Sequence, residues 1–91
     1  MVDCSHANSN KNHNLQPLVL DNVANQILEG NTSIVGAMIE SHLSGGNQKL
    51  SSNPDELEYG VSVTDACVDG KTNERSILAM ADKLSQVLNT R

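Results

Sequence analysis

Aromatic side chains are almost absent from this sequence: among 91 residues there is one Tyr, Tyr59, and no Phe or Trp. Aromatic rings bury the largest apolar area per residue, so a core without them depends on Leu, Ile, Val, Met and Ala. A domain of this length buries roughly 60–65% of the surface that its unfolded chain exposes. The shortage of rings therefore predicts either a marginally stable fold or a buried surface shared with a larger body.

Clustered positive charge is missing as well. Six basic residues stand against eleven acidic ones, and the formal net charge is −5. Binding to nucleic-acid backbones or to anionic membranes needs a concentrated face of Lys and Arg. The basic residues are instead dispersed along the chain: Lys11, Lys49, Lys71, Arg75, Lys83 and Arg91. We therefore expect neither a nucleic acid nor a membrane as a partner.

Long apolar runs and cysteine motifs are also lacking. No run approaches the roughly 18 apolar residues of a membrane span, and no secretion signal opens the chain. Cys4 and Cys67 are the only cysteines, and they form neither a CxxC nor a zinc-ribbon spacing. This pattern favours reduced thiols in a cytoplasmic protein, with a disulfide as the alternative.

What the sequence does contain is an alternation of short strands and helices. Residues 1–2 have the character of a strand end, and residues 3–14 form a polar loop rich in Asn and Ser. Across residues 15–29 apolar side chains recur at intervals of three and four, which predicts a helix. Gly30 is expected to end that helix.

A nearly unbroken apolar run over residues 33–40 predicts a strand covered on both faces, as in parallel sheets. A long connection over residues 44–63 leads to a second helix, for which Thr72 or Asn73 is the expected N-cap. The apolar stripe of this helix consists of Ile77, Met80, Ala81, Leu84, Val87 and Leu88. The order strand, helix, strand, helix predicts an α/β fold with a parallel sheet. Because two strands alone leave unpaired edges, we expect part of a barrel.

Polar residues follow the strands at their carboxyl ends, where parallel sheets and barrels build their sites. His6 follows the first strand, Glu40 ends the second, and Asp65 lies in the connection after it. One imidazole and two carboxylates suit a divalent metal such as Mn²⁺, Fe²⁺, Co²⁺ or Zn²⁺. Each also has a structural alternative: His6 as a hydrogen-bonding group, Glu40 as a strand end entering solvent, and Asp65 as a turn residue. On an ideal strand Asp3 and His6 face opposite ways, unless the chain bends after Cys4.

Three blocks of the sequence are MVDCSHANSNK, IVGAMIESHLSGGNQ and YGVSVTDAC. In order and spacing they resemble the C-terminal quarter of the type I 3-deoxy-D-arabino-heptulosonate 7-phosphate (DAHP) synthases, also called phospho-2-dehydro-3-deoxyheptonate aldolases. The resemblance implies that residues 1–91 are one incomplete domain, the last two β/α units of a (β/α)8 TIM barrel. It also implies a fragment, since six strands precede this point in the family.

The resemblance further implies an activity: the metal-dependent condensation of phosphoenolpyruvate with erythrose 4-phosphate, the first step of the shikimate pathway. Separately from the resemblance, the open strands and apolar helix faces predict a homo-oligomer. The family holds its divalent metal (Mn, Fe, Co or Zn) with a Cys, a His, a Glu and an Asp. His6, Glu40 and Asp65 match the last three, and His6 is also the implied catalytic residue. The Cys belongs to an earlier part of the barrel, so Cys4 and Cys67 are not its substitutes.

The Lys and Arg residues that clamp the two phosphates in the family have no counterpart here, so we expect the 91 residues alone to be inactive. The alternative is a non-catalytic assembly module that completes a split barrel or self-associates through open strands and apolar helix faces.

Two departures from the family pattern are the absence of Trp at residues 68–71 and a slightly long connection at residues 51–58. Both fall on loops and spare the three expected ligands.

Overall fold

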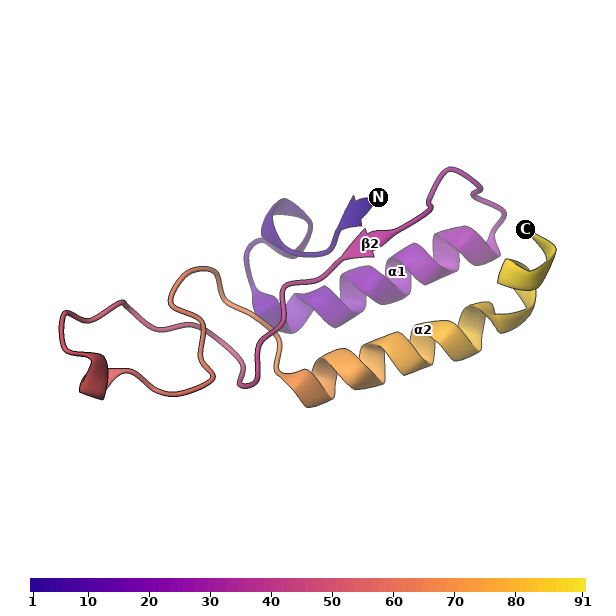
Figure 1. Cartoon of the computed structure of the whole chain (residues 1–91). Coiled ribbons are helices and arrows are strands. Elements are labelled where there is room, and N and C mark those ends of the chain that lie inside the picture. Colours follow the sequence, from indigo (N-terminus) through magenta and orange to yellow (C-terminus); the bar gives the residue numbers. More distant parts are fainter.

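The structure, a computed structural model, describes residues 1–91 and contains two helices and a pair of short parallel strands (Figure 1). The elements in chain order are β1 Val2–Asp3, α1 Gln16–Leu28, β2 Ala37–Met38 and α2 Gly70–Thr90. Three single-turn 3-10 helices lie at His6–Ser9, His13–Leu15 and Pro54–Glu56. The predicted order of strand, helix, strand, helix is confirmed, and the chain is a small α/β unit.

The two strands run in the same direction because α1 carries the chain back between them. Val2 lies opposite Ala37 and Asp3 opposite Met38. A backbone hydrogen bond of 2.8 Å from Cys4 N to Met38 O continues the ladder past the end of β1. The carboxyl ends of both strands therefore lie at the same edge of the pair, where polar side chains follow each of them.

The second strand is shorter and more exposed than the run over residues 33–40 predicted. Only Ala37 and Met38 pair as a strand, and Val35 is 82% exposed. β2 has β1 on one edge and no strand on the other. The expectation of a strand covered on both faces is therefore wrong for this structure, because an apolar run is covered only where neighbouring elements lie against it.

Helix α1 confirms the helix expected over residues 15–29 to within one residue at each end. Its buried apolar side chains lie on one face, as the spacing predicted: Leu20, Val23, Ala24 and Ile27. Gly30 follows the helix with a φ of +107°, in the left-handed region where glycine commonly ends helices. The end of α1 is thus set by a residue that tolerates this backbone conformation.

Helix α2 begins earlier than the expected N-cap at Thr72 or Asn73. Asp69 is the N-cap, because its carboxylate accepts a hydrogen bond of 3.2 Å from the backbone N–H of Thr72. Gly70 is the first helical residue. Asp is at least as effective an N-cap as Thr, so the earlier acidic residue satisfies the free N–H groups of the first turn.

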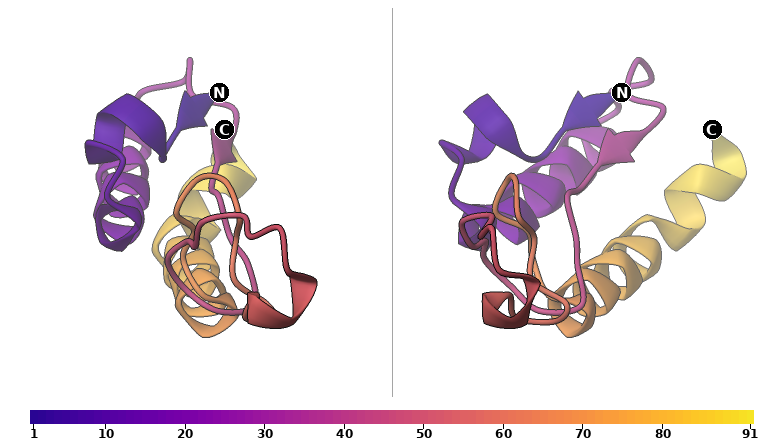
Figure 2. Two further views of the ribbon diagram at one scale, coloured as in Figure 1. Left: turned by 90° about the vertical axis from the view of Figure 1, so that its left-hand side faces the viewer. Right: turned by 60° about the vertical axis from the view of Figure 1, so that its left-hand side comes forward.

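The core is small and lies between the helices. Leu84 of α2 packs against Val23, Ala24 and Ile27 of α1. Figure 2 shows both helices on the same side of the two strands. Leu84 is the only buried member of the apolar stripe predicted for α2. Neither helix has both the length and the apolar character that crossing a membrane requires.

Much of the remaining stripe borders an open depression. Ile77 and Leu88 are 51% and 50% exposed. They line a groove of about 540 Å³ whose other walls are α1 and residues 34–39, and most of the lining is apolar. We call this depression the apolar groove. Its lining includes Ala37 of β2 and no residue of β1.

Residues 39–69 form a long connection beyond the carboxyl ends of the strands (Figure 1). The molecule measures 53 × 23 × 16 Å, and it is elongated because this connection projects from the helix pair. Isolated bridges fold the connection back on itself, pairing Ser41 with Val68, Gly46 with Cys67, and Asn47 with Ser62. The fold-back returns residue 65 to the edge where β2 ends.

Candidate metal centre

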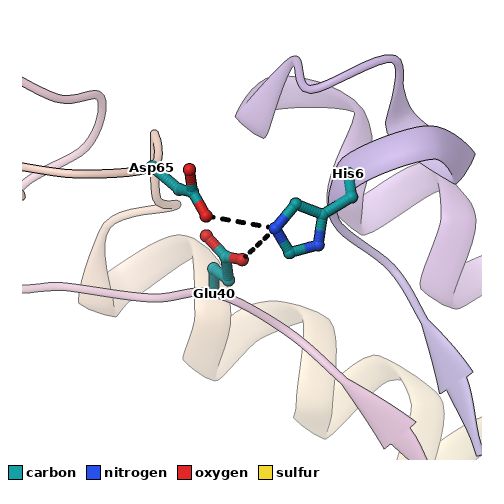
Figure 3. Close-up of side chains that lie close together, drawn as sticks. All are labelled: His6, Glu40 and Asp65. Carbon is teal, nitrogen blue, oxygen red and sulfur yellow. Dashed lines mark hydrogen bonds and ion pairs between the residues drawn. The ribbon is translucent and has the colours of Figure 1, made fainter.

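His6, Glu40 and Asp65 converge although they lie in three separate segments (Figure 3). His6 Nε2 is 2.9 Å from Glu40 Oε1 and 3.1 Å from Asp65 Oδ2. One ligand atom from each residue lies within 4.8 Å of the other two. The structure thus brings together the three residues that the sequence singled out. Their role as metal ligands stays a prediction.

A bend in the backbone after β1 directs His6 toward the other two residues. His6 itself has a φ of +45°, in the left-handed region that is rare for a residue with a side chain. Asp3 Oδ2 accepts a hydrogen bond of 2.9 Å from His6 Nδ1, and Asp3 Oδ1 accepts one of 2.8 Å from Ser5 N. Asp3 and His6 therefore lie on the same side, as the bend after Cys4 allows, and not on opposite sides as on an ideal strand.

A buried amide holds the main chain at Glu40. Gln16, the first residue of α1, is fully buried. Its Oε1 accepts a hydrogen bond of 2.9 Å from Glu40 N, and its Nε2 donates one of 3.2 Å to Glu40 O. Gln16 is not among the residues predicted from the sequence, because a polar residue at a helix start normally faces solvent.

Backbone contacts within the connection bring Asp65 beside Glu40. Val68 N donates to Glu40 O at 3.0 Å, so the segment after Asp65 is joined directly to the end of β2. Asn47 Nδ2 donates to Thr64 O at 2.9 Å and supports the turn from the other side. The side chain of Asp65 is 62% exposed, whereas that of Glu40 is 19% exposed. The cluster is therefore anchored on its Glu40 side and open to solvent on its Asp65 side.

The electrostatic environment favours a positive charge. The pKa of His6 is raised, first by its hydrogen bond with Asp3 and next by that with Asp65, while desolvation opposes the rise and the charge of Glu40 adds to it. The pKa of Asp3 is lowered, mainly by the same hydrogen bond to His6. Three carboxyl groups thus surround one imidazole. Their negative potential stabilises the imidazolium form of His6. The same potential would stabilise a metal cation bound among them.

The donor set fits a divalent metal. It offers one imidazole nitrogen and two carboxylate oxygens, a mixture suited to Mn²⁺, Fe²⁺, Co²⁺ or Zn²⁺. Ligands bound at about 2.1 Å and at right angles to each other lie about 3 Å apart. The separations of 2.9 and 3.1 Å from His6 Nε2 to the two carboxylate oxygens match this spacing. Two of the three separations thus fit ligands of one ion, and all three ligand atoms lie within 4.8 Å of one another.

A polar cavity of about 250 Å³ lies beside the cluster. Its lining includes Ser5, Lys11, Asn47 and Thr64 in addition to His6 and Asp65. The two cysteines are not members of the cluster. Both are buried free thiols, and burial is the main cause that raises the pKa of each. Because the thiolate is the form that binds metals, a raised pKa makes Cys4 and Cys67 poorer ligands still.

Named relatives match this chain along its full length. Tyr-sensitive phospho-2-dehydro-3-deoxyheptonate aldolases of Enterobacter agglomerans and Escherichia coli (strain K12) are 46% and 45% identical to it over 91 residues. The matches take in 100% of this chain. The chain spans only 43% and 26% of the lengths of these two curated relatives.

A solved structure and a family model agree with these relatives. The phospho-2-dehydro-3-deoxyheptonate aldolase from Francisella tularensis SCHU S4 is similar with a TM-score of 0.83 and 41% identity. The similarity covers 93% of this chain and 24% of that one. Residues 1–77 match the family model described as the DAHP synthetase I family. The chain therefore belongs to the DAHP synthetase I family.

Proposed function

We propose that this chain supplies the metal-binding quarter of a phospho-2-dehydro-3-deoxyheptonate aldolase. That enzyme condenses phosphoenolpyruvate with erythrose 4-phosphate and releases phosphate, as the first step of the shikimate pathway. The observation that carries the proposal is the convergence of His6, Glu40 and Asp65 in a chain of this family. These residue types suit the divalent metal that such a condensation uses.

The proposal includes the place of residues 1–91 in a larger fold. They form the last two β/α units of a (β/α)8 barrel, β1 with α1 and β2 with α2, and so one incomplete domain. The parallel strands, the helix that connects them and the site at their carboxyl ends all support this placement. The similarity to 24% of the Francisella enzyme has the extent expected for two units out of eight.

In the proposed site, each of the three residues has a definite part. A bound Mn, Fe, Co or Zn ion would supply Lewis-acid polarisation of the aldehyde oxygen of erythrose 4-phosphate. His6 Nε2, Glu40 and Asp65 would hold that ion, and His6 would be a catalytic residue through this direct contact. Glu40 and Asp65 contribute two negative charges, which offset the charge of the ion. Because the side chain of Asp65 is exposed, the substrates could reach the ion from that side.

The 91 residues alone are expected to bind metal but not to catalyse the condensation. No group of Lys and Arg residues gathers at the site to hold two phosphate-bearing substrates; only Lys11 lines the neighbouring cavity. The purified chain, assayed with Mn²⁺ and both substrates, should form no measurable product. Turnover at the rate of a complete enzyme would contradict the expected inactivity.

Metal binding by the same chain tests the site itself. Calorimetric titration with Mn²⁺ and Co²⁺ should show one ion per chain, and His6→Ala should abolish binding. His13→Gln is the matched control, because it removes an imidazole outside the cluster. Equal binding by the wild type and His6→Ala would overturn the proposed centre.

A second candidate function, assembly, is supported by the apolar groove. The free edge of β2 leaves backbone hydrogen-bonding groups without a partner strand. Ile77 and Leu88 expose apolar side chains. Asn73 Oδ1, also in the groove wall, is buried without a hydrogen-bond partner. The chain would then complete a split barrel or associate with a second copy as a homo-oligomer. The proposal places it in the cytoplasm, where both thiols stay reduced.

A further inference from the structure

The contact between Asp3 and His6 determines which ring nitrogen faces the cluster. Asp3 Oδ2 lies 2.9 Å from His6 Nδ1. An ionised carboxylate only accepts hydrogen bonds, so Nδ1 carries the proton in this contact. In the neutral ring the lone pair is then on Nε2, the atom 2.9 Å from Glu40 and 3.1 Å from Asp65 (Figure 3).

Asp3 is itself held in place and is not a member of the ligand cluster. Its Oδ1 accepts a hydrogen bond of 2.8 Å from Ser5 N, and its main-chain oxygen accepts one of 2.7 Å from Asn8 Nδ2. Its backbone lies in β1, opposite Met38 of β2. Both carboxylate oxygens are thus engaged with groups of the turn, on the side of the imidazole that faces away from Glu40 and Asp65.

The backbone of His6 makes this support necessary. Its φ of +45° is a conformation that residues with a Cβ rarely adopt, and such backbones persist where surrounding contacts fix them. The imidazole is 42% exposed, so packing alone does not fix the ring. The hydrogen bond to Asp3 is the contact made by its Nδ1 atom.

We propose that Asp3 is a positioning residue of the metal centre, which sets the tautomer and the orientation of His6 so that Nε2 binds the ion. The inference rests on the proposed function, because it requires that His6 holds a metal. Outer carboxylates that accept from a metal-bound His typically change metal affinity by about 10–100-fold. Asp3 would act through His6 and touch neither the ion nor the substrates.

The test uses the full 91-residue chain and zinc ions alone. Zn²⁺ is diamagnetic, so the His6 ring can be followed by NMR in the loaded protein. The zinc-loaded wild type should show a downfield, slowly exchanging Nδ1–H proton on His6, and Asp3→Asn should lose it. Asp3→Asn should also bind zinc about 10–100-fold more weakly by calorimetry. Asp82→Asn, an exposed carboxylate on α2, is the matched control and should bind as the wild type does.

The possible outcomes distinguish a failure of the role proposed for Asp3 from a failure of the proposed metal centre. Wild-type protein that binds zinc through His6 without a protected Nδ1–H would overturn the role of Asp3 and leave the metal centre intact. Zinc affinity of folded Asp3→Asn within twofold of the wild type would do the same. Wild-type protein that binds no zinc would overturn the metal centre and, with it, this inference. The wild-type NMR signal needs no substitution, so the test holds even if Asp3→Asn does not fold.

Discussion

At the scale of single residues, the candidate site depends on side chains that are not themselves ligands. Gln16 is the clearest case, because its amide makes two hydrogen bonds to the main chain of Glu40. It joins the start of α1 to the end of β2 and so fixes the point from which the Glu40 side chain extends. A buried polar side chain needs such partners, and both the oxygen and the nitrogen of the Gln16 amide have one.

Replacing Gln16 by Met should therefore lower both stability and metal affinity. Met keeps a similar volume but leaves Glu40 N and O without these partners, at a cost of about 1–3 kcal/mol in the free energy of unfolding. Urea denaturation of the metal-free chain measures the first effect, and calorimetric titration with Co²⁺ measures the second. Gln26→Met is the control, since Gln26 is exposed and its side chain bonds only Asn22 on the same helix. Equal urea midpoints for Gln16→Met and Gln26→Met would show that the hydrogen bonds of Gln16 to Glu40 contribute nothing to stability.

At the scale of elements, the start of α2 makes stability depend on pH. The pKa of Asp69 is lowered from 3.8, mainly by its hydrogen bond with Thr72. A group with a lowered folded-state pKa stabilises the fold above its unfolded pKa, and the contribution is lost as the pH falls through the folded value. The thermal midpoint should therefore fall in acid below about pH 4.

Two variants isolate this contribution of the cap. Asp69→Asn keeps a capping oxygen without a titrating group, so it should flatten the part of the acid transition that Asp69 causes. Asp69→Ala removes the cap and should lower the midpoint at neutral pH as well. Circular dichroism melts from pH 3 to pH 7 provide the comparison. An Asp69→Asn curve parallel to that of the wild type throughout would contradict a role of Asp69 in the pH dependence.

Two glycines at helix boundaries should respond to alanine in opposite ways. Gly30 has a φ of +107° and no atom within 4 Å of an added Cβ, so Gly30→Ala is opposed by the backbone and not by crowding. It should destabilise the chain by about 1 kcal/mol. Gly70 begins α2 with ordinary room for a Cβ, so Gly70→Ala should stabilise it by about 0.4–1 kcal/mol. Urea midpoints of the two variants measure this, and a shift of the same sign in both would refute the argument.

At the scale of the whole molecule, the chain exposes apolar surface that a stable monomer normally covers. The apolar groove borders β2, and β2 also has an edge without a partner strand, so both apolar side chains and backbone hydrogen-bonding groups are left open. A second strand and helix placed there would cover both kinds of group at once. This geometry favours association over a solitary globule.

Introducing a charge into the groove should reduce that association. Ile77→Glu places a carboxylate on the groove wall, whereas Leu78→Glu adds the same group at a neighbouring exposed position outside the groove lining. Size-exclusion chromatography with light scattering should show concentration-dependent association of the wild type and of Leu78→Glu, and a shift toward monomer for Ile77→Glu. A monomeric wild type at every concentration would rule out self-association through this surface.

Features that depend on local pattern could be predicted from the order of residues alone. The spacing of Leu20, Val23, Ala24 and Ile27 predicted the buried face of α1, because helical periodicity repeats every few residues. The polar residues after each apolar run identified His6, Glu40 and Asp65 as candidates, and their proximity agrees with parallel strands that end at one edge. The DAHP synthase resemblance drawn from three sequence blocks is confirmed by the family match.

Contacts between distant segments could not be predicted in this way and became known from the folded chain. The burial of Gln16 against Glu40, the bend that turns His6 onto Asp3 and the shortening of β2 to two residues all depend on which segment lies beside which. The N-cap of α2 is Asp69 and not the predicted Thr72 or Asn73, because the Asp69 carboxylate accepts the hydrogen bond from the N–H of Thr72. The periodicity of a helix can be recognised from consecutive residues, whereas burial and hydrogen-bond partners depend on segments that meet only when the chain folds.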